Sequence, residues 1–178
     1  MNIFVTDVDP VKSAINLDDK RVRHMPKECV EMLAIYIHFV TNQWLIKFPL
    51  WGGEDRADVN FLYNHPCSRW IRKDKRNMQW LYKHTLALLE EWEHRFDGVN
   101  PIIAEFSIVA EFLDSHLQDT CELPVKFQNS SLNKNIPVID AYRETMMHKW
   151  FVTDKIKPVR WSKRNPPTWI HTQQNLEL

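Results

Sequence analysis

Apolar residues recur at helical spacing between residues 74 and 96, and this run limits the possible fold more than any other feature. Residues three or four apart share one face of an α-helix, and neither Gly nor Pro interrupts the run. Asp74 precedes it and is a residue type favoured as a helix N-cap. We therefore expect one long amphipathic helix that ends near Phe96. Its apolar stripe consists of Met78, Leu81, Tyr82, Leu86, Leu89 and Trp92.

Other segments carry start signals for helices. Asp9-Pro10 predicts a short helix to about Arg23, because Asp caps helices and Pro is favoured at their first position. Pro26 predicts the start of the next helix, which is expected to end near Trp44. Similar patterns predict helices at about 66–73, from residue 100 onward, and at about 138–151. The segments 47–63 and 118–136 are predicted loops, and residues 2–5 (NIFV) are a predicted short strand.

The chain contains only three Gly among its 178 residues. This shortage argues against β-rich folds with many tight turns and against Gly loops that bind phosphate. The length suits one compact domain, and 44% hydrophobic residues can build a sizeable core. We therefore predict an all-α fold, a single compact helical domain over residues 1–178 with at most one or two short strands. The basic, Trp-containing tail at 155–178 is expected to pack on this domain.

The cysteines Cys29, Cys67 and Cys121 are odd in number and far apart. They predict neither a disulfide framework nor a zinc site, and no other motif predicts a metal or a small-molecule cofactor. No apolar run is long enough for a membrane helix, and the N-terminus lacks the apolar core of a signal peptide. We expect an intracellular protein with no membrane partner. The sequence leaves the oligomeric state open.

Charge is distributed unevenly although the formal net charge is zero. Six Lys and Arg accompany one Asp between His65 and His84, and the same count applies between His148 and Arg164. Nine acids accompany one Arg between residues 90 and 122. Such a chain either meets a polyanion with one side of its surface or pairs its charged helix faces with one another. Charge alone leaves both interpretations open.

A cluster of charged residues surrounds Pro26 in the stretch NLDDKRVRHMPKECVEML, residues 16–33. If a helix begins at Pro26, Glu28 falls in its first turn, where the helix dipole favours an acid by about 0.3–1 kcal/mol. That interpretation needs no function. Alternatively, a carboxylate among cations at the mouth of a basic cleft can stabilise developing positive charge or move protons. The neighbouring charged residues are Asp19, Lys20, Arg21, His24 and Lys27.

Two further segments combine cations with aromatic residues. In NHPCSRW, residues 64–70, His65 and Arg69 stand at an expected helix start, where free N–H groups and the dipole favour phosphate. Arg72 follows on the same segment. The tail interleaves charges with Trp, a pattern suited to phosphate contact and base stacking, in Arg160, Trp161, Lys163, Arg164 and Trp169. Each segment also has a structural interpretation, in which the Trp rings pack on the core and the cations stay solvated.

In this order, the motifs resemble those of the pyrimidine-dimer DNA glycosylases of the phage endonuclease V type. A bacterial and phage offshoot of that family carries an L-D…R…E pattern, an N-H-P…W pattern, and a long helix that ends with Glu and Arg. The corresponding residues here are Leu17, Asp18, Arg21, Glu28, Asn64, His65, Pro66, Trp70, Glu91 and Arg95. The chain is more closely similar to a group of short phage proteins that open M-N-I-F-V-x-D-x-D-P and close A-Y-R…W…R.P..W.

The resemblance implies an all-α enzyme that acts on duplex DNA in the cytoplasm of a bacterial host cell. Such an enzyme flips a base out of the duplex and cuts its glycosidic bond, and bifunctional members then nick the strand. Glu28 matches the family's catalytic acid, which stabilises the oxocarbenium-like sugar. The residues expected to bind DNA are Arg21, His24, Lys27, His65, Arg69, Arg72, Arg160, Lys163, Arg164 and Trp169.

The sequence leaves open both the nucleophile and the type of activity. The family's α-amine nucleophile requires removal of Met1 before a small residue, and here the larger Asn2 follows. The candidate nucleophiles are therefore Lys20, the amine of Met1 and an activated water. Three alternatives remain open. The protein is an enzyme that excises bases from DNA, a non-catalytic DNA-binding protein that counters host defence, or an enzyme that acts on modified nucleotides.

Overall fold

The structure, a computed structural model, describes residues 2–50, 56–116, 123–124, 126–154 and 158–170. Within these ranges the chain is all-α and no residue forms a strand, so the predicted strand at residues 2–5 is wrong. The helices are α1 (Pro10–Ile15), α2 (Asp19–Thr41), α3 (Arg56–Asn64), α4 (Pro66–Lys73), α5 (Lys75–Phe96), α6 (Ile103–His116) and α7 (Val138–His148). A π-helical turn, η1 (Lys149–Thr153), directly continues α7.

The first two helices differ from their predicted bounds around Pro26. Asp9 caps α1 as predicted, and its carboxylate accepts two backbone N–H groups of the first turn. However, α1 ends at Ile15, and α2 begins at Asp19 and passes through Pro26, so the predicted helix start at Pro26 is wrong. A Pro inside a helix removes one backbone hydrogen bond. Packing offsets that loss, because one side of α2 is buried along most of its length.

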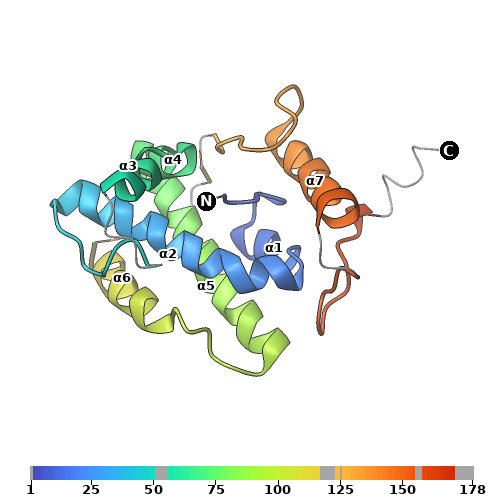
Figure 1. The fold of residues 1–178 in the computed structure, drawn as a ribbon, viewed down its shortest axis with the longest axis horizontal. Helices are drawn as coiled ribbons and strands as arrows, with labels where there is room; N and C mark the ends of the chain where they lie inside the picture. Colours follow the sequence, from blue (N-terminus) through green and yellow to red (C-terminus); the bar gives the residue numbers. More distant parts are fainter. Residues whose placement is uncertain (1, 51–55, 117–122, 125, 155–157, 171–178) are drawn as a thin grey trace.

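The long helices α2 and α5 cross at the centre of the molecule (Figure 1), and α1 packs on α5 beside this crossing. The predicted stripe of α5 and the buried face of α2 supply the core. Val30 and Leu33 of α2 are wholly buried, as are Leu81 and, almost completely, Met78 of α5. Leu86 departs from the prediction, since it is 42% exposed. The crossing therefore fixes the direction in which each face of α2 points.

The helices α3 and α4 lie together over one end of α2 (Figure 1). The predicted loop at 47–63 is wrong in part, because α3 begins within it, and residues 51–55 lie outside the described residues. The predicted start of α4 is confirmed: His65 is its N-cap, and the His65 Nδ1 atom accepts the N–H of Cys67 at 3.2 Å. Of the predicted loop at 118–136, residues 118–122 and 125 lie outside the described residues, and the rest forms no helix or strand.

Residues 158–170, the tail segment, pack against η1 and the start of α2. The Trp150 ring of η1 stacks on Trp169, with ring centres 5.5 Å apart, and meets Trp161 edge-on at 4.9 Å. The Trp161 indole N–H also donates to the carbonyl of Asn16 at 3.1 Å. Residues 155–157 and 171–178 of the predicted tail lie outside the described residues. The tail segment thus encloses the N-terminal end of α2.

Candidate functional site

Glu28 lies in the interior of α2, in its third turn, and its side chain is half-buried. Its Oε2 atom accepts the backbone N–H of Asn2 at 2.9 Å. The helix dipole acts mainly on the first turn, so it does not explain the position of this acid. The carboxylate is held instead against the N-terminal segment of the chain.

The N-terminal segment, residues 2–6, is an anchored stretch of irregular chain. The Asn2 side-chain oxygen accepts the N–H groups of Ile3 at 2.8 Å and Phe4 at 3.3 Å. Ile3 and Val5 are wholly buried. The apolar residues that predicted a strand therefore act as an anchor, which holds the backbone of Asn2 beside Glu28.

Basic residues precede Glu28 along one face of α2. Lys20, His24 and Lys27 stand eight, four and one residues before it, and spacings of three and four residues align side chains on a helix. His24 is exposed, whereas Lys20 and Lys27 are partly buried. The structure therefore brings together four of the predicted site residues on one helix face.

The start of α4 lies close to Glu28. The negative charge of Glu28 acts on the Cys67 thiol, which is buried near the Ser130 hydroxyl at 3.6 Å. Desolvation lowers the pKa of His65, so its imidazole is neutral near pH 7 and its Nδ1 atom can serve as the cap acceptor. His65 therefore supplies a neutral ring, not a cation, at the start of α4.

The two described cysteines are neutral thiols. Cys29 and Cys67 are both free and wholly buried. Burial raises the pKa of each thiol, and the charge of Glu28 raises both further. Neither group is a ready nucleophile, because the thiolate is the reactive form. Cys121 lies outside the described residues.

Arg21, a predicted DNA contact, is buried in an ion-pair cluster at the start of α2. Its guanidinium pairs with Asp154 and, at 3.3 Å, with Asp18. Asp18 also accepts the indole N–H of Trp150 at 2.8 Å. Lys20 also pairs with Asp154, with an Nζ–Oδ1 distance of 3.1 Å. These contacts connect the L-D…R motif to the C-terminal part of the chain.

A second cluster joins α5 to the tail segment. The Arg164 guanidinium binds Glu91 with an Nη2–Oε1 distance of 2.5 Å, and Arg95 binds the same carboxylate at 2.8 Å. Burial alone would raise the pKa of Glu91, but these two cations lower it. Asp19 completes the connection, because its carboxylate accepts the Ser162 hydroxyl at 2.6 Å and lies 3.3 Å from Arg95.

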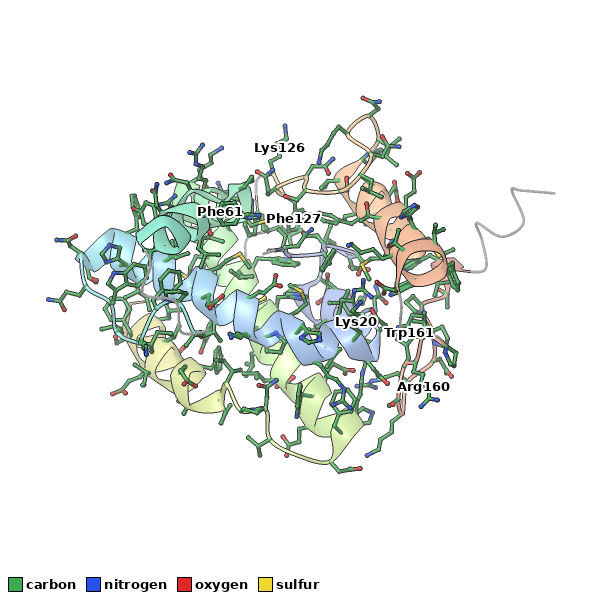
Figure 2. All side chains as sticks on the ribbon, in the orientation of Figure 1. Lys20, Phe61, Lys126, Phe127, Arg160 and Trp161 are labelled. Carbon is green, nitrogen blue, oxygen red and sulfur yellow. The ribbon has the colours of Figure 1, made fainter. Side chains whose placement is uncertain are left out.

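A pocket of about 360 Å³ opens where α2 meets the tail segment. Figure 2 shows Lys20 on α2 with Arg160 and Trp161 of the tail segment beside it. Arg160 is exposed, and its backbone carbonyl accepts the N–H of Asp19 at 2.9 Å. The exposed Lys163 pairs with Asp97 at 2.5 Å. Of the tail cations, Arg160 is therefore the one that faces the pocket.

The remaining predicted DNA contacts lie on α4 and in the tail segment. Arg69 is exposed, and its guanidinium approaches the Asn64 side chain at 3.4 Å. Arg72 is half-buried and donates to the carbonyl of Tyr63 at 2.7 Å. Trp169 is half-buried in its stack on Trp150. The structure thus places Arg69 on the surface, whereas Arg72 and Trp169 make internal contacts.

Phe61 on α3 is an exposed aromatic residue that the sequence analysis did not single out. Its ring is 67% exposed and meets the His65 ring edge-on, with centres 6.2 Å apart. It lies in the segment predicted as a loop, where a single Phe gives no periodic signal. Figure 2 shows it beside α4, away from Lys20.

Two further features of the described residues bear on the type of site. No group of three or more His, Cys, Asp or Glu side chains within the described ranges is arranged to hold a metal ion. In the same ranges, none of the helices is both long enough and apolar enough to cross a membrane.

The chain belongs to the pyrimidine dimer DNA glycosylase family, whose model matches residues 1–101. The match includes the N-terminal segment, Glu28, His65, Glu91 and Arg95, and it ends before α6. No curated protein and no solved structure matches the chain. Membership of this family indicates a DNA glycosylase-like function and implies that the substrate is DNA.

Proposed function

We propose that the protein excises a damaged or modified base from duplex DNA, with Glu28 as the catalytic carboxylate. The observation that carries this proposal is the position of Glu28, half-buried on a helix face that also bears Lys20, His24 and Lys27. An enzyme side chain cannot reach the bond between sugar and base while the base is stacked in a duplex. The target nucleotide must therefore leave the stack to bring its sugar to this carboxylate.

Glu28 acts on the bond between the sugar C1′ atom and the base. As this bond breaks, its electron pair leaves with the base and positive charge develops on the sugar, where a nearby carboxylate stabilises it. The oxygen of a water molecule then bonds to C1′, and its proton passes to the carboxylate or the departing base. The Asn2 N–H bond at 2.9 Å holds the carboxylate in place for these steps.

The nucleophile in this proposal is water. Lys20, one candidate amine, is engaged by Asp154 at 3.1 Å. The other candidate, the amine of Met1, lies outside the described residues. Strand nicking by a covalent amine would leave an imine that borohydride reduces to a stable cross-link. We expect no borohydride-trapped complex, and a trapped complex that survives Lys20→Ala would assign the reaction to another amine.

The DNA is expected to lie across the exposed face of α2. At one end, the exposed Arg160 offers a cation to phosphates. At the other end, the exposed Phe61 ring and Arg69 offer stacking and charge. Glu28 lies between these two ends on α2, so a nucleotide extruded midway meets the carboxylate.

Glu28→Gln tests the proposal, because it keeps the shape of the side chain and removes its charge. Base release from duplexes with defined lesions or modified bases is measured under single-turnover conditions, at equal folded concentration. We expect the rate to fall about a hundred- to a thousandfold and the stability to change by less than about 1 kcal/mol. Glu90→Gln, at an exposed position on α5, is the matched control and should retain full activity.

Two outcomes would contradict the proposal in different ways. Full activity in Glu28→Gln would remove Glu28 from the catalytic role. If the wild-type protein binds DNA but releases no base from any lesion or modified duplex, the protein is a DNA-binding module without the chemistry. Parallel incubation with free modified nucleotides would show whether the protein acts on these nucleotides instead of on DNA.

A further inference from the structure

An apolar pocket adjoins the pocket where α2 meets the tail segment. Its volume is about 600 Å³, within the range of about 300–1,000 Å³ typical of small-molecule sites. Pro158 and Val159 line both pockets, so the two form one groove, here called the tail groove. Glu28 lines neither pocket, and most of the lining residues follow position 101, where the family match ends.

The apolar end of the tail groove is open and carries flat side chains. Phe151 of η1 is 44% exposed, and Pro158 is exposed as well. The half-buried Trp161 lines the same pocket, and Figure 2 shows it on the tail segment. Its ring is held edge-on to Trp150 and by the indole N–H bond to the carbonyl of Asn16. A planar apolar ring can therefore stack on a surface that is already in place.

The other end of the tail groove carries two arginines without acid partners. Arg23 of α2 and Arg160 of the tail segment both line it, and both are exposed. The Arg23 guanidinium lies 3.8 Å from the centre of the Phe96 ring and 5.6 Å from that of Trp92. Among the described residues, neither guanidinium donates a hydrogen bond or forms an ion pair. The rings hold the plane of Arg23 and leave its N–H groups available for two phosphate oxygens.

The three acids that line this end of the groove are already neutralised. Each is paired with an arginine whose side chain is at most 7% exposed. The pairs are Asp18 and Asp154 with Arg21, and Asp19 with Arg95. Because these acids are occupied, the two unpaired guanidinium groups give this end an excess of positive charge.

We infer that the tail groove binds one unpaired nucleotide of a DNA strand, with its phosphate between Arg23 and Arg160 and its base on Phe151 and Trp161. The cations complement the phosphate and the open apolar surface complements the base. The two ends adjoin, as phosphate and base do in a nucleotide. This inference rests on the proposed function in taking DNA as the ligand, but Glu28 has no part in it. A free nucleotide has the same chemistry and is the alternative source.

Three duplexes that differ at one position test the inference. One is fully paired, one carries a single unpaired thymidine, and one carries an unpaired abasic residue with the same phosphate. Fluorescence anisotropy measures their affinities. We expect the thymidine duplex to bind about tenfold more tightly than the paired duplex, and the abasic duplex to lose about five- to tenfold of that affinity because it has no base to stack.

Substitutions at the apolar end test where the base lies. Phe151→Ala should abolish the difference between the thymidine and the abasic duplex, because it removes the exposed ring. Val152→Ala is the matched control, since Val152 is the next residue of η1, is 66% exposed and does not line the groove. It should keep the difference. Both side chains are exposed, so both variants should fold.

A double-substitution cycle tests the shared phosphate. Arg23→Ala and Arg160→Ala should each weaken binding of both unpaired duplexes about tenfold. The double variant should lose no more than about twofold beyond either, because the two guanidinium groups hold one phosphate. Lys12→Ala removes the same charge outside the groove and should have no effect. Arg23→Lys should recover the salt dependence but not the full affinity, since an ammonium cannot bind two oxygens in a fixed plane.

Three results would overturn the inference: equal binding of the thymidine and abasic duplexes, a base preference that survives Phe151→Ala, or additive effects of Arg23→Ala and Arg160→Ala. Thymidine monophosphate distinguishes the two sources. If it competes at concentrations similar to those of the thymidine duplex, the groove binds free nucleotides and the assignment to a DNA strand is wrong. Only binding is measured, so a protein that fails to excise bases still gives a result here.

Discussion

Replacing Glu31 with Gln is expected to stabilise the protein above neutral pH and to destabilise it by about 1 kcal/mol in acid. Glu31 lies on α2, three residues after Glu28, and its side chain is wholly buried. Its Oε1 atom accepts the N–H of Leu50 at 2.9 Å, but its Oε2 atom has no hydrogen-bond partner among the described residues. Burial therefore dominates and raises the pKa of Glu31 to about 7.

The size and direction of the effect follow from that pKa. The carboxyl binds its proton more tightly in the folded than in the unfolded protein, so stability falls as the pH rises from 4.5 to about 7. One pKa unit corresponds to about 1.4 kcal/mol, so above this window the ionised Glu31 costs about 3 kcal/mol. A Gln amide avoids this cost, although its unpaired N–H groups cost about 1 kcal/mol. The net gain expected above the window is about 2 kcal/mol.

Urea denaturation followed by Trp fluorescence measures this gain. The free energy of unfolding of Glu31→Gln and the wild type is compared at about pH 5 and about pH 8. Glu111→Gln, at an exposed position on α6, is the control and should follow the wild type at both pH values. If the difference between Glu31→Gln and the wild type is the same at both, Glu31 does not titrate in this range and the reasoning from burial fails.

Three further predictions concern the ion-pair clusters and the DNA surface. Arg95→Met should lower the free energy of unfolding by about 3–5 kcal/mol, because the Arg95 side chain is fully buried against Glu91; unchanged urea denaturation would contradict this. Arg160→Ala should reduce the log–log salt slope of DNA binding by about one, whereas Arg164→Ala should reduce it less because Arg164 already pairs with Glu91; fluorescence anisotropy across salt concentrations compares them. Phe61→Ala should raise the activation free energy of base release by about 1 kcal/mol or more without loss of stability, because the proposed role of the exposed ring is to stack on DNA; an unchanged single-turnover rate would exclude that contact.

The starts of α4 and α5 could be predicted from the sequence because their signals are local. A cap residue and the N–H groups that it binds lie within three positions of one another. Asp74 accepts the N–H of Arg76 in the first turn of α5, as its residue type predicts, and Pro66 follows the cap residue His65 at the first position of α4. The periodic stripe of α5 is equally local, and its end at Phe96 agrees with the prediction.

The helix through Pro26 and the helix α3 could not be predicted in this way. Pro26 removes a local hydrogen bond, and the packing of α2 across α5 outweighs that loss. The segment that contains α3 carries Pro and Gly before it and no long apolar stripe. Both elements depend on neighbours that are distant in the sequence, and local patterns do not report those neighbours.

The sequence could identify Glu28 as a candidate but not the reason for its position. The dipole interpretation depended on a helix start at Pro26, which is wrong, and Asn2 is the partner that holds the carboxylate. The charges of Arg21 and Arg164 predicted phosphate contacts, whereas the structure pairs both with acids. Residue type gives the charge of a side chain, but only the fold shows whether another part of the chain neutralises it.

The anchoring of the tail segment by residues of α2 and α5 also sets an order of folding. Its contacts join residues that are 143 positions apart, from Asp19 to Ser162, and 73 positions apart, from Glu91 to Arg164. Such contacts close long loops, which costs entropy before any contact forms. The tail segment can make both contacts at once only after α2 and α5 have packed together. We therefore expect the tail segment to dock last in folding and to open first, so that its backbone amides exchange hydrogen faster than those of the α2–α5 crossing.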